Sequence, residues 1–167
     1  MSEGDGYLIT LLIGTASLIL LLLELRSNHV WNQKRTSYEL MNEMITSGRM
    51  TGALERLQQQ HGWDILNDDS SYADVAGRIG PRGAERLKAL DGEMVVIMRH
   101  LEMLSISIQH GIVSERICRD GFYSFFAKIH ENGRPFIEKE RARRGNPHIY
   151  ERFECYALKW GGRGIAA

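Results

Sequence analysis

The stretch LKALDGEMVVIMRHLEMLSISI, residues 87–108, decides the fold that we expect for this chain. Its apolar side chains recur at alternating intervals of three and four residues, which is the spacing of one helix face sustained over three heptads. The residues of this stripe are Leu87, Leu90, Met94, Ile97, Leu101, Leu104 and Ile108. Such a stripe is buried only when other helices pack against it, so the sequence predicts an all-α bundle.

The segment that follows supplies a partner for this helix. Gly111 is expected to end the first helix and Ser114 to cap the next one. The second stripe consists of Cys118, Phe122, Phe125 and Ile129. We expect the two helices to form a long antiparallel hairpin. The second helix is predicted to run to Arg144 with a kink near residues 133–135, because a proline inside a helix removes a backbone donor.

Shorter helices are expected on both sides of the hairpin. Residues 145–147, Gly-Asn-Pro, break the chain before a last helix over residues 148–160, with Pro147 in its first turn. Residues 51–60 are predicted to form a short helix capped by Thr51. The segment 61–83 is expected to be a loop and a short helix that ends before its Gly-Pro pair.

An apolar run near the N-terminus, GYLITLLIGTASLILLLL at residues 6–23, contains no charge. As a helix it covers about 27 Å, close to the thickness of the hydrocarbon core of a bilayer. We therefore expect residues 6–25 to form a transmembrane helix that continues to Gly48 as one long helix. A cleaved signal peptide is the alternative, but the preceding residues are acidic and no Ala-x-Ala follows. A buried helix of a soluble protein fits less well, because Leu and Ile occupy all sides of the run.

The charges beside this run predict its orientation. No Lys or Arg precedes it, whereas Arg26, Lys34 and Arg35 follow it, and positive residues remain on the cytoplasmic side. Residues 1–5 are then a short extracytoplasmic tail, residues 26–160 a cytoplasmic helical domain, and the glycine-rich residues 161–167 a flexible tail.

Composition excludes some partners. The chain has 21 basic and 21 acidic residues and thus no net field to attract nucleic acid, and none is expected as a partner. The basic cluster at residues 139–144 is interpreted as a solvated helix end, with contact to lipid headgroups as the alternative. Cys118 and Cys155 lack metal-ligand or redox spacing and are predicted to be small core residues.

Several segments resemble a bacterial family known only as a domain of unknown function. They are Leu101–Ile106, Gly111–Val113, Arg134–Lys139 and Asn146–Glu154. The resemblance implies one N-terminal membrane span and a helical cytoplasmic domain, and hence a location in the bacterial inner membrane. It implies no activity and no catalytic residues.

An enzymatic site would have to use Glu93, His100, Glu102 or His110, which lie on one predicted helix. No Glu-x-x-His, His-Glu-x-x-His, Gly-x-Ser-x-Gly or phosphate-binding loop accompanies them, so no catalytic residue, metal or cofactor is predicted. Glu102 is expected to pair with an Arg or a Tyr where two helices cross.

Two surfaces are candidates for partner contact. In the span, Thr10, Gly14 and Ser17 share one face and would let another helix approach closely. In the last helix, the aromatic residues are expected either to close the core or to face a partner; they are Tyr150, Phe153, Tyr156 and Trp160. We therefore expect a membrane-anchored accessory protein that binds a protein partner or larger membrane complex, or a further copy of itself. A membrane-tethered enzyme or sensor is the alternative.

Overall fold

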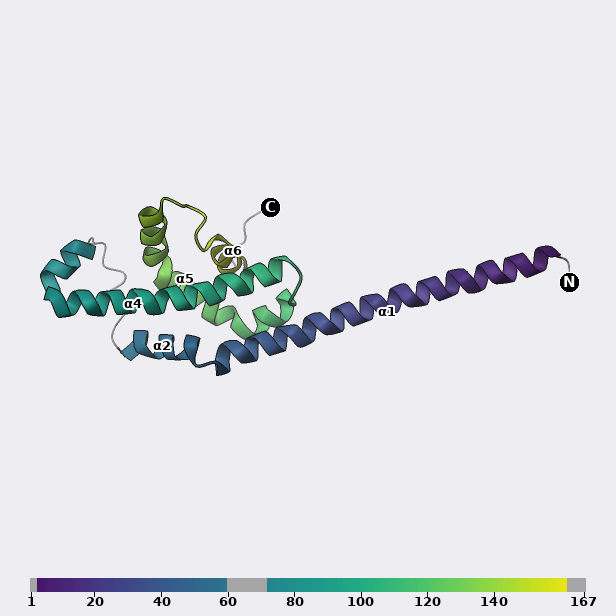
Figure 1. Ribbon diagram of the computed structural model, residues 1–167, viewed down its shortest axis with the longest axis horizontal. Coiled ribbons are helices and arrows are strands. Elements are labelled where there is room, and N and C mark those ends of the chain that lie inside the picture. The colour runs from purple at the N-terminus through teal and green to yellow at the C-terminus, as the bar shows by residue number, and fades with distance from the viewer. Residues whose placement is uncertain (1–2, 60–71, 162–167) are drawn as a thin grey trace.

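The computed structural model describes the backbone of residues 3–59 and 72–161, with the side chains of residues 12–59, 85 and 88–161. In this part the chain is all-α, as predicted (Figure 1). The helices are α1 (Glu3–Thr46), α2 (Arg49–Gln59), α4 (Tyr72–Gln109), α5 (Glu115–Arg144) and α6 (Glu151–Trp160). Residues 1–2 and 162–167 of the predicted tails, residue 60 of the predicted short helix and residues 61–71 of the predicted loop segment lie outside the described residues.

Helix α1 is one continuous helix of 44 residues, which confirms the prediction of a single long helix. Figure 1 shows its N-terminal half extending away from the bundle formed by the other helices. Its C-terminal half is attached to the turn between α4 and α5, where Gln33 donates to the carbonyl of Gly111 and the Ser37 hydroxyl accepts from the Ser114 N–H at 2.8 Å. Across the described part of the chain, no helix combines the length and the apolar composition needed to cross a membrane.

Helix α2 begins two residues before the predicted start. Gly48 adopts φ +68°, which glycine tolerates better than other residues, and its carbonyl accepts from the N–H of Gly52 at 2.9 Å. Thr51 therefore lies inside the first turn and is not the cap. The helix buries Met50, Ala53 and Leu57.

The apolar stripe of α4 forms the centre of the core. Its members from Leu90 to Ile108 are buried, which confirms the predicted face; the side chain of Leu87 lies outside the described set. The predicted break at Gly80-Pro81 is wrong, because α4 begins at Tyr72 and continues through both residues. A proline lacks one donor only, and a helix can bend there without ending.

The predicted hairpin is only partly correct. Helices α4 and α5 are joined by a short turn, but the helices most closely associated with α4 are α2 and α6. In Figure 1, α5 starts on one side of α4 and ends on the other, so the two helices cross. Gly133 allows this approach: a Cβ there would lie 2.5 Å from the Cε atoms of both Met94 and Met98.

Helix α5 has the predicted limits, and three of the four predicted stripe residues, Cys118, Phe122 and Ile129, are buried. It follows Ser114, contains Pro135, and ends at Gly145, whose left-handed φ of 61° allows its N–H to bond back to the carbonyl of Ala142. Phe126 is buried in place of the predicted Phe125, which is only half-buried. Both positions fit a helical stripe, and the ring of Phe126 lies against Phe153 and Trp160 of α6, which decides between them.

The last helix begins at Glu151, three residues after the predicted start. Residues 147–150 form a turn, because Tyr150 has a left-handed φ of 59° that an α-helix cannot include. Pro147 thus lies in this turn and not in the first turn of α6.

Candidate functional site

The titratable residues proposed from sequence do not converge on one site. Glu93 of α4 accepts two hydrogen bonds from Arg56 of α2, at 2.6 and 2.8 Å, and so links these helices. His100 directs Nδ1 at the carbonyl of Val96 in its own helix, 2.7 Å away. His110 is exposed at the end of α4. These contacts stabilise helices and bring no pair of groups together for acid–base chemistry.

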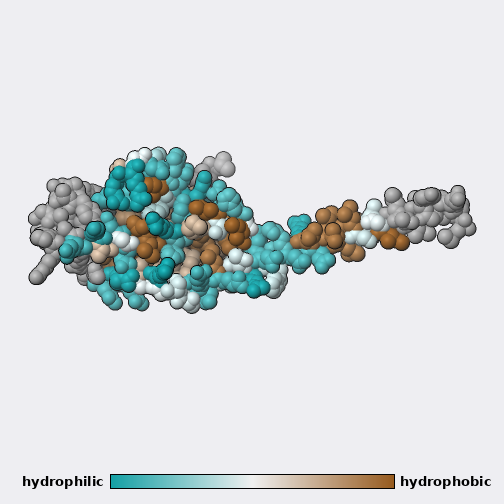
Figure 2. Space-filling model, in the orientation of Figure 1, coloured by the Kyte–Doolittle hydropathy of each residue, from teal (hydrophilic) through white to brown (hydrophobic). Residues whose placement is uncertain are grey.

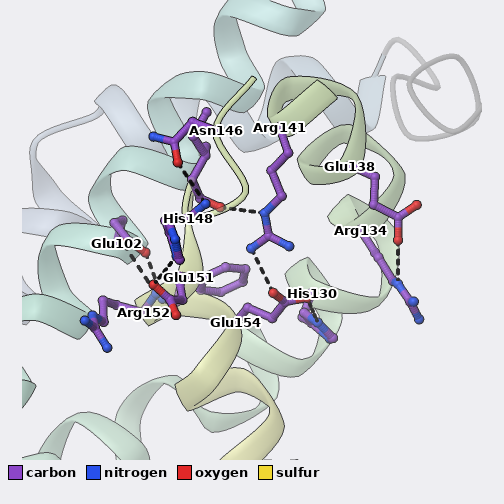
Figure 3. Close-up of polar contacts among 12 residues, drawn as sticks. Glu102, His130, Arg134, Glu138, Arg141, Asn146, His148, Glu151, Arg152 and Glu154 are labelled. Carbon is purple, nitrogen blue, oxygen red and sulfur yellow. Dashed lines mark hydrogen bonds and ion pairs between the residues drawn. The ribbon is translucent and has the colours of Figure 1, made fainter. Parts of the chain in front are cut away.

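Glu102 caps the start of α6. Its carboxylate accepts from the backbone N–H of Phe153 at 2.8 Å and lies 3.4 Å from that of Arg152 (Figure 3). The first N–H groups of a helix have no partner within the helix and favour a negative charge. The expectation that Glu102 pairs with an Arg or Tyr side chain is wrong, because it binds backbone groups from a helix fifty positions away.

A second cluster holds the return of the chain from α5 to α6. Arg141 donates to the carbonyl of Ile149 at 3.0 Å and to Glu154 at 2.9 Å (Figure 3). On the other side of Glu154, His130 Nε2 lies 3.6 Å from Oε1, which is too long for a hydrogen bond. This Nε2 is buried and has no hydrogen-bond partner among the described residues. Arg141 belongs to the basic cluster interpreted from sequence as a solvated helix end, whereas the spacing of His130 and Glu154 gives no local signal for this contact.

The turn itself is built from the segment Asn146–Glu151. The side chain of Asn146 accepts from the N–H of His148 at 2.9 Å, and the His148 ring lies 3.2 Å from the carboxylate of Glu151 (Figure 3). This segment belongs to the part of the sequence that carries the family resemblance. Its polar side chains bond within the turn, so their presence is explained by the fold and requires no ligand.

The basic cluster at residues 139–144 is tied to a buried carboxylate. Glu140 is 3% exposed and lies 2.6 Å from Arg143 and 2.9 Å from Arg144, the latter at an angle that makes no hydrogen bond. Because the one carboxylate of Glu140 offsets part of the charge of the two arginines, the cluster is less available to an anion than its sequence indicates. The outer parts of both arginines remain in solvent.

The aromatic residues of the last helix mostly close the core. Tyr150, Phe153 and Trp160 are buried, and the Trp160 ring lies 4.6 Å from that of Phe126. Tyr156 is half-buried and is the member of this set with the most open face. For the three buried residues, the structure favours closure of the core over contact with a partner.

The face proposed for partner contact in the apolar segment consists of Thr10, Gly14 and Ser17, and the structure describes only part of it. The side chain of Thr10 lies outside the described set. A Cβ at Gly14 would have no neighbour within 4 Å, and the Ser17 hydroxyl donates to the carbonyl of Ile13 in the same helix at 2.8 Å. Both residues are exposed, and no side chain among the described residues covers them.

The two cysteines differ. Cys118 is buried as predicted, and burial raises the pKa of its thiol to about 11. Cys155 is exposed, which contradicts its prediction as a core residue, because it lies on the opposite side of α6 from the buried Phe153 and Ala157. Within the described residues, no three His, Cys, Asp or Glu side chains are placed to hold a metal.

The largest cavity among those characterised lies between α4 and α5 and measures about 550 Å³. Its walls combine apolar and charged side chains, including Val95 and Phe136 with Lys88 and Glu140. The size suits a small molecule.

A family model matches residues 11–160, and the family is described as Domain of unknown function (DUF4760). No match was found among curated proteins or among solved structures.

Proposed function

This chain belongs to the family described as Domain of unknown function (DUF4760), and we propose that it is a single-span membrane protein whose helical domain binds or stabilises a larger membrane complex. In this proposal, it anchors in the bacterial inner membrane, keeps its bundle in the cytoplasm and performs no catalysis itself.

The observation that carries the proposal is the exposed apolar segment of α1. Its large side chains are 54–67% exposed from Leu12 to Leu25, well away from the bundle (Figure 2). Leu20, Leu21, Leu22 and Leu23 are consecutive, and successive helix positions point about 100° apart, so these four side chains surround the helix. A protein partner would cover one side of such a helix, whereas lipid covers all sides. The uncharged run starts at Gly6, before the first described side chain, and has the length of a bilayer core.

The bundle supports an interaction role. It buries its own core, and its polar clusters join helix to helix: Glu93 joins α4 to α2, Glu102 joins α4 to α6, and Glu154 is bound by Arg141 of α5. Metal analysis of the purified full chain tests the enzyme alternative, since a stoichiometric metal would favour catalysis and contradict this part of the proposal.

Membrane extraction tests the anchor. We expect the full chain to remain in bacterial membranes after alkaline carbonate treatment. A Leu20→Glu/Leu21→Glu variant should be released, because charges in hydrocarbon are costly, whereas the matched Leu20→Ile/Leu21→Ile variant should remain. Release of the unaltered chain by carbonate would refute the proposed span.

The exposed Cys155 offers a test of orientation. A membrane-impermeant maleimide should label it only after the inner membrane is permeabilised. Cys118 is a silent control, because the thiolate is the reactive form and burial raises the pKa of that thiol to about 11. If the maleimide labels the chain in intact spheroplasts, the proposed orientation is wrong. That labelling should then disappear in Cys155→Ser and persist in Cys118→Ser.

A partner in the membrane is tested at Gly14. Because a Cβ there meets nothing within 4 Å, Gly14→Leu leaves the contacts of this chain intact. Proteins that co-purify stoichiometrically in mild detergent should be lost from Gly14→Leu and kept in Ala16→Leu, a change on a different side of α1. Equal recovery from both variants would argue against a contact through this face.

A further inference from the structure

One face of α1 directly follows the exposed apolar segment and precedes the bundle. It forms a shallow hollow of about 360 Å³ along a single helix. The residues that line it are Leu23, Arg26, Ser27, Val30, Trp31 and Lys34. Trp31 is 60% exposed, although indole rings are usually buried at least at one end. In Figure 2, hydrophilic residues follow the apolar part of α1 toward the bundle.

The two basic residues of this face differ from the next one along the helix. Arg35 lies 2.7 Å from Glu39 in an ion pair. Arg26 and Lys34 form no ion pair with any residue that the structure describes. The face therefore combines an exposed indole with two positive charges that have no ion-pair partner among the described residues. It complements a surface whose apolar and anionic parts follow one another along the helix axis.

With α1 as the proposed membrane span, helix geometry puts these groups at the edge of the bilayer. Trp31 lies six residues, or about 9 Å, beyond Leu25, the last residue of the predicted span. Side chains on a helix lean toward its N-terminus by about one turn, which here means toward the apolar segment. The indole thus falls within the headgroup layer, where Trp residues gather, and the charges of Arg26 and Lys34 lie on either side of it.

We propose that this face binds the headgroups of anionic phospholipids, with Trp31 in the headgroup layer and with Arg26 and Lys34 on the lipid phosphates. The inference rests on the membrane anchoring proposed above. It assigns a lipid class to a site, which anchoring alone does not do.

Quenching of Trp31 fluorescence tests the proposal. The full chain is reconstituted into vesicles of phosphatidylcholine and phosphatidylglycerol at equal mole fractions, with bromine on the acyl chains of one lipid or the other. The signal of Trp31 is the difference between the intact chain and Trp31→Phe, which removes the contributions of the other tryptophans. We expect stronger quenching by brominated phosphatidylglycerol than by brominated phosphatidylcholine.

The charge variants provide the matched comparison. Each basic residue near an anionic surface contributes about a five-fold preference, so Arg26→Gln and Lys34→Gln should each lower the preference by about that factor. Arg35→Gln should change it little, because Arg35 already has a carboxylate partner. High salt should weaken the preference.

Two results would overturn the inference while leaving the anchor intact. One is equal quenching by both brominated lipids in a chain that resists carbonate extraction. The other is the same loss of preference in Arg35→Gln as in Lys34→Gln. A chain that carbonate extracts would overturn both the inference and the anchor on which it rests.

Discussion

Phe126 occupies the point where α5 meets α6, and its removal tests the observed core directly. Its side chain is fully buried, and its ring centroid lies 5.2 Å from that of Phe153 and 4.6 Å from that of Trp160. Truncating a buried Phe to Ala costs about 3–5 kcal/mol, including the cavity that remains. The substitution also removes two aromatic pairs, so the expected loss of unfolding free energy lies in the upper part of this range.

The neighbouring residue is the control for this prediction. Phe125 is only half-buried, and its ring lies 6.2 Å from that of Phe122. Phe125→Ala should cost about 1 kcal/mol, in the ordinary range of substitutions outside the core. For a domain of about 130 residues, each kcal/mol corresponds to about 3–5 °C, so Phe126→Ala should lower Tm by about 10–20 °C.

The assay is thermal unfolding of the full chain in mild detergent, followed by near-ultraviolet circular dichroism. This signal reports packing of the aromatic core rather than helix content. Equal Tm values for the two variants, or a lower one for Phe125→Ala, would refute the assignment of Phe126 to the core.

Three further predictions concern single contacts, each measured by urea unfolding of the full chain. Glu102→Ala should lower the free energy of unfolding by about 1–2 kcal/mol, because two N–H groups of α6 lose their acceptor; Glu102→Gln should retain much of this, and equal losses would contradict a capping role. Gly145→Ala should cost about 1–2 kcal/mol through its φ of +61° alone, since no atom lies within 4 Å of the added Cβ, whereas an unchanged value would show that the turn relaxes. For Glu115, burial raises the pKa, but hydrogen bonds from Lys159 and Trp160 outweigh it and hold the pKa below 4.5. A carboxyl with a lower pKa in the folded state stabilises the fold above its unfolded pKa and loses that contribution as the pH falls through the folded pKa. Glu115→Gln should therefore flatten the loss of stability on acidification below about pH 4.5, and an unaltered pH profile would exclude this contribution.

Local patterns predicted the limits of several helices and the buried face of α4. The three- and four-residue spacing from Leu90 to Ile108 depends on helix geometry alone, so it could be predicted without knowledge of the partners. The ends at Gly111 and Gly145 follow in the same way, because each has a left-handed φ that glycine adopts without strain.

Features set by long-range packing could not be predicted. Phe125 and Phe126 fit the stripe of α5 equally well, and the arrival of α6 decides between them. Glu102 meets α6 only because the two helices are brought together across fifty residues. The cluster of His130, Arg141 and Glu154 depends on the same packing. In sequence these residues are ordinary polar positions.

The unbroken course of α1 fixes the angular position of the bundle relative to the exposed apolar segment. One residue added between Leu25 and Gln33 would turn the bundle by about 100° around the helix axis and raise it by about 1.5 Å. Seven added residues would complete nearly two turns and return the bundle to within about 20° of its original direction, farther along the axis. A partner that contacts both the apolar segment and the bundle would therefore respond to the length of this connection periodically, with the repeat of the helix.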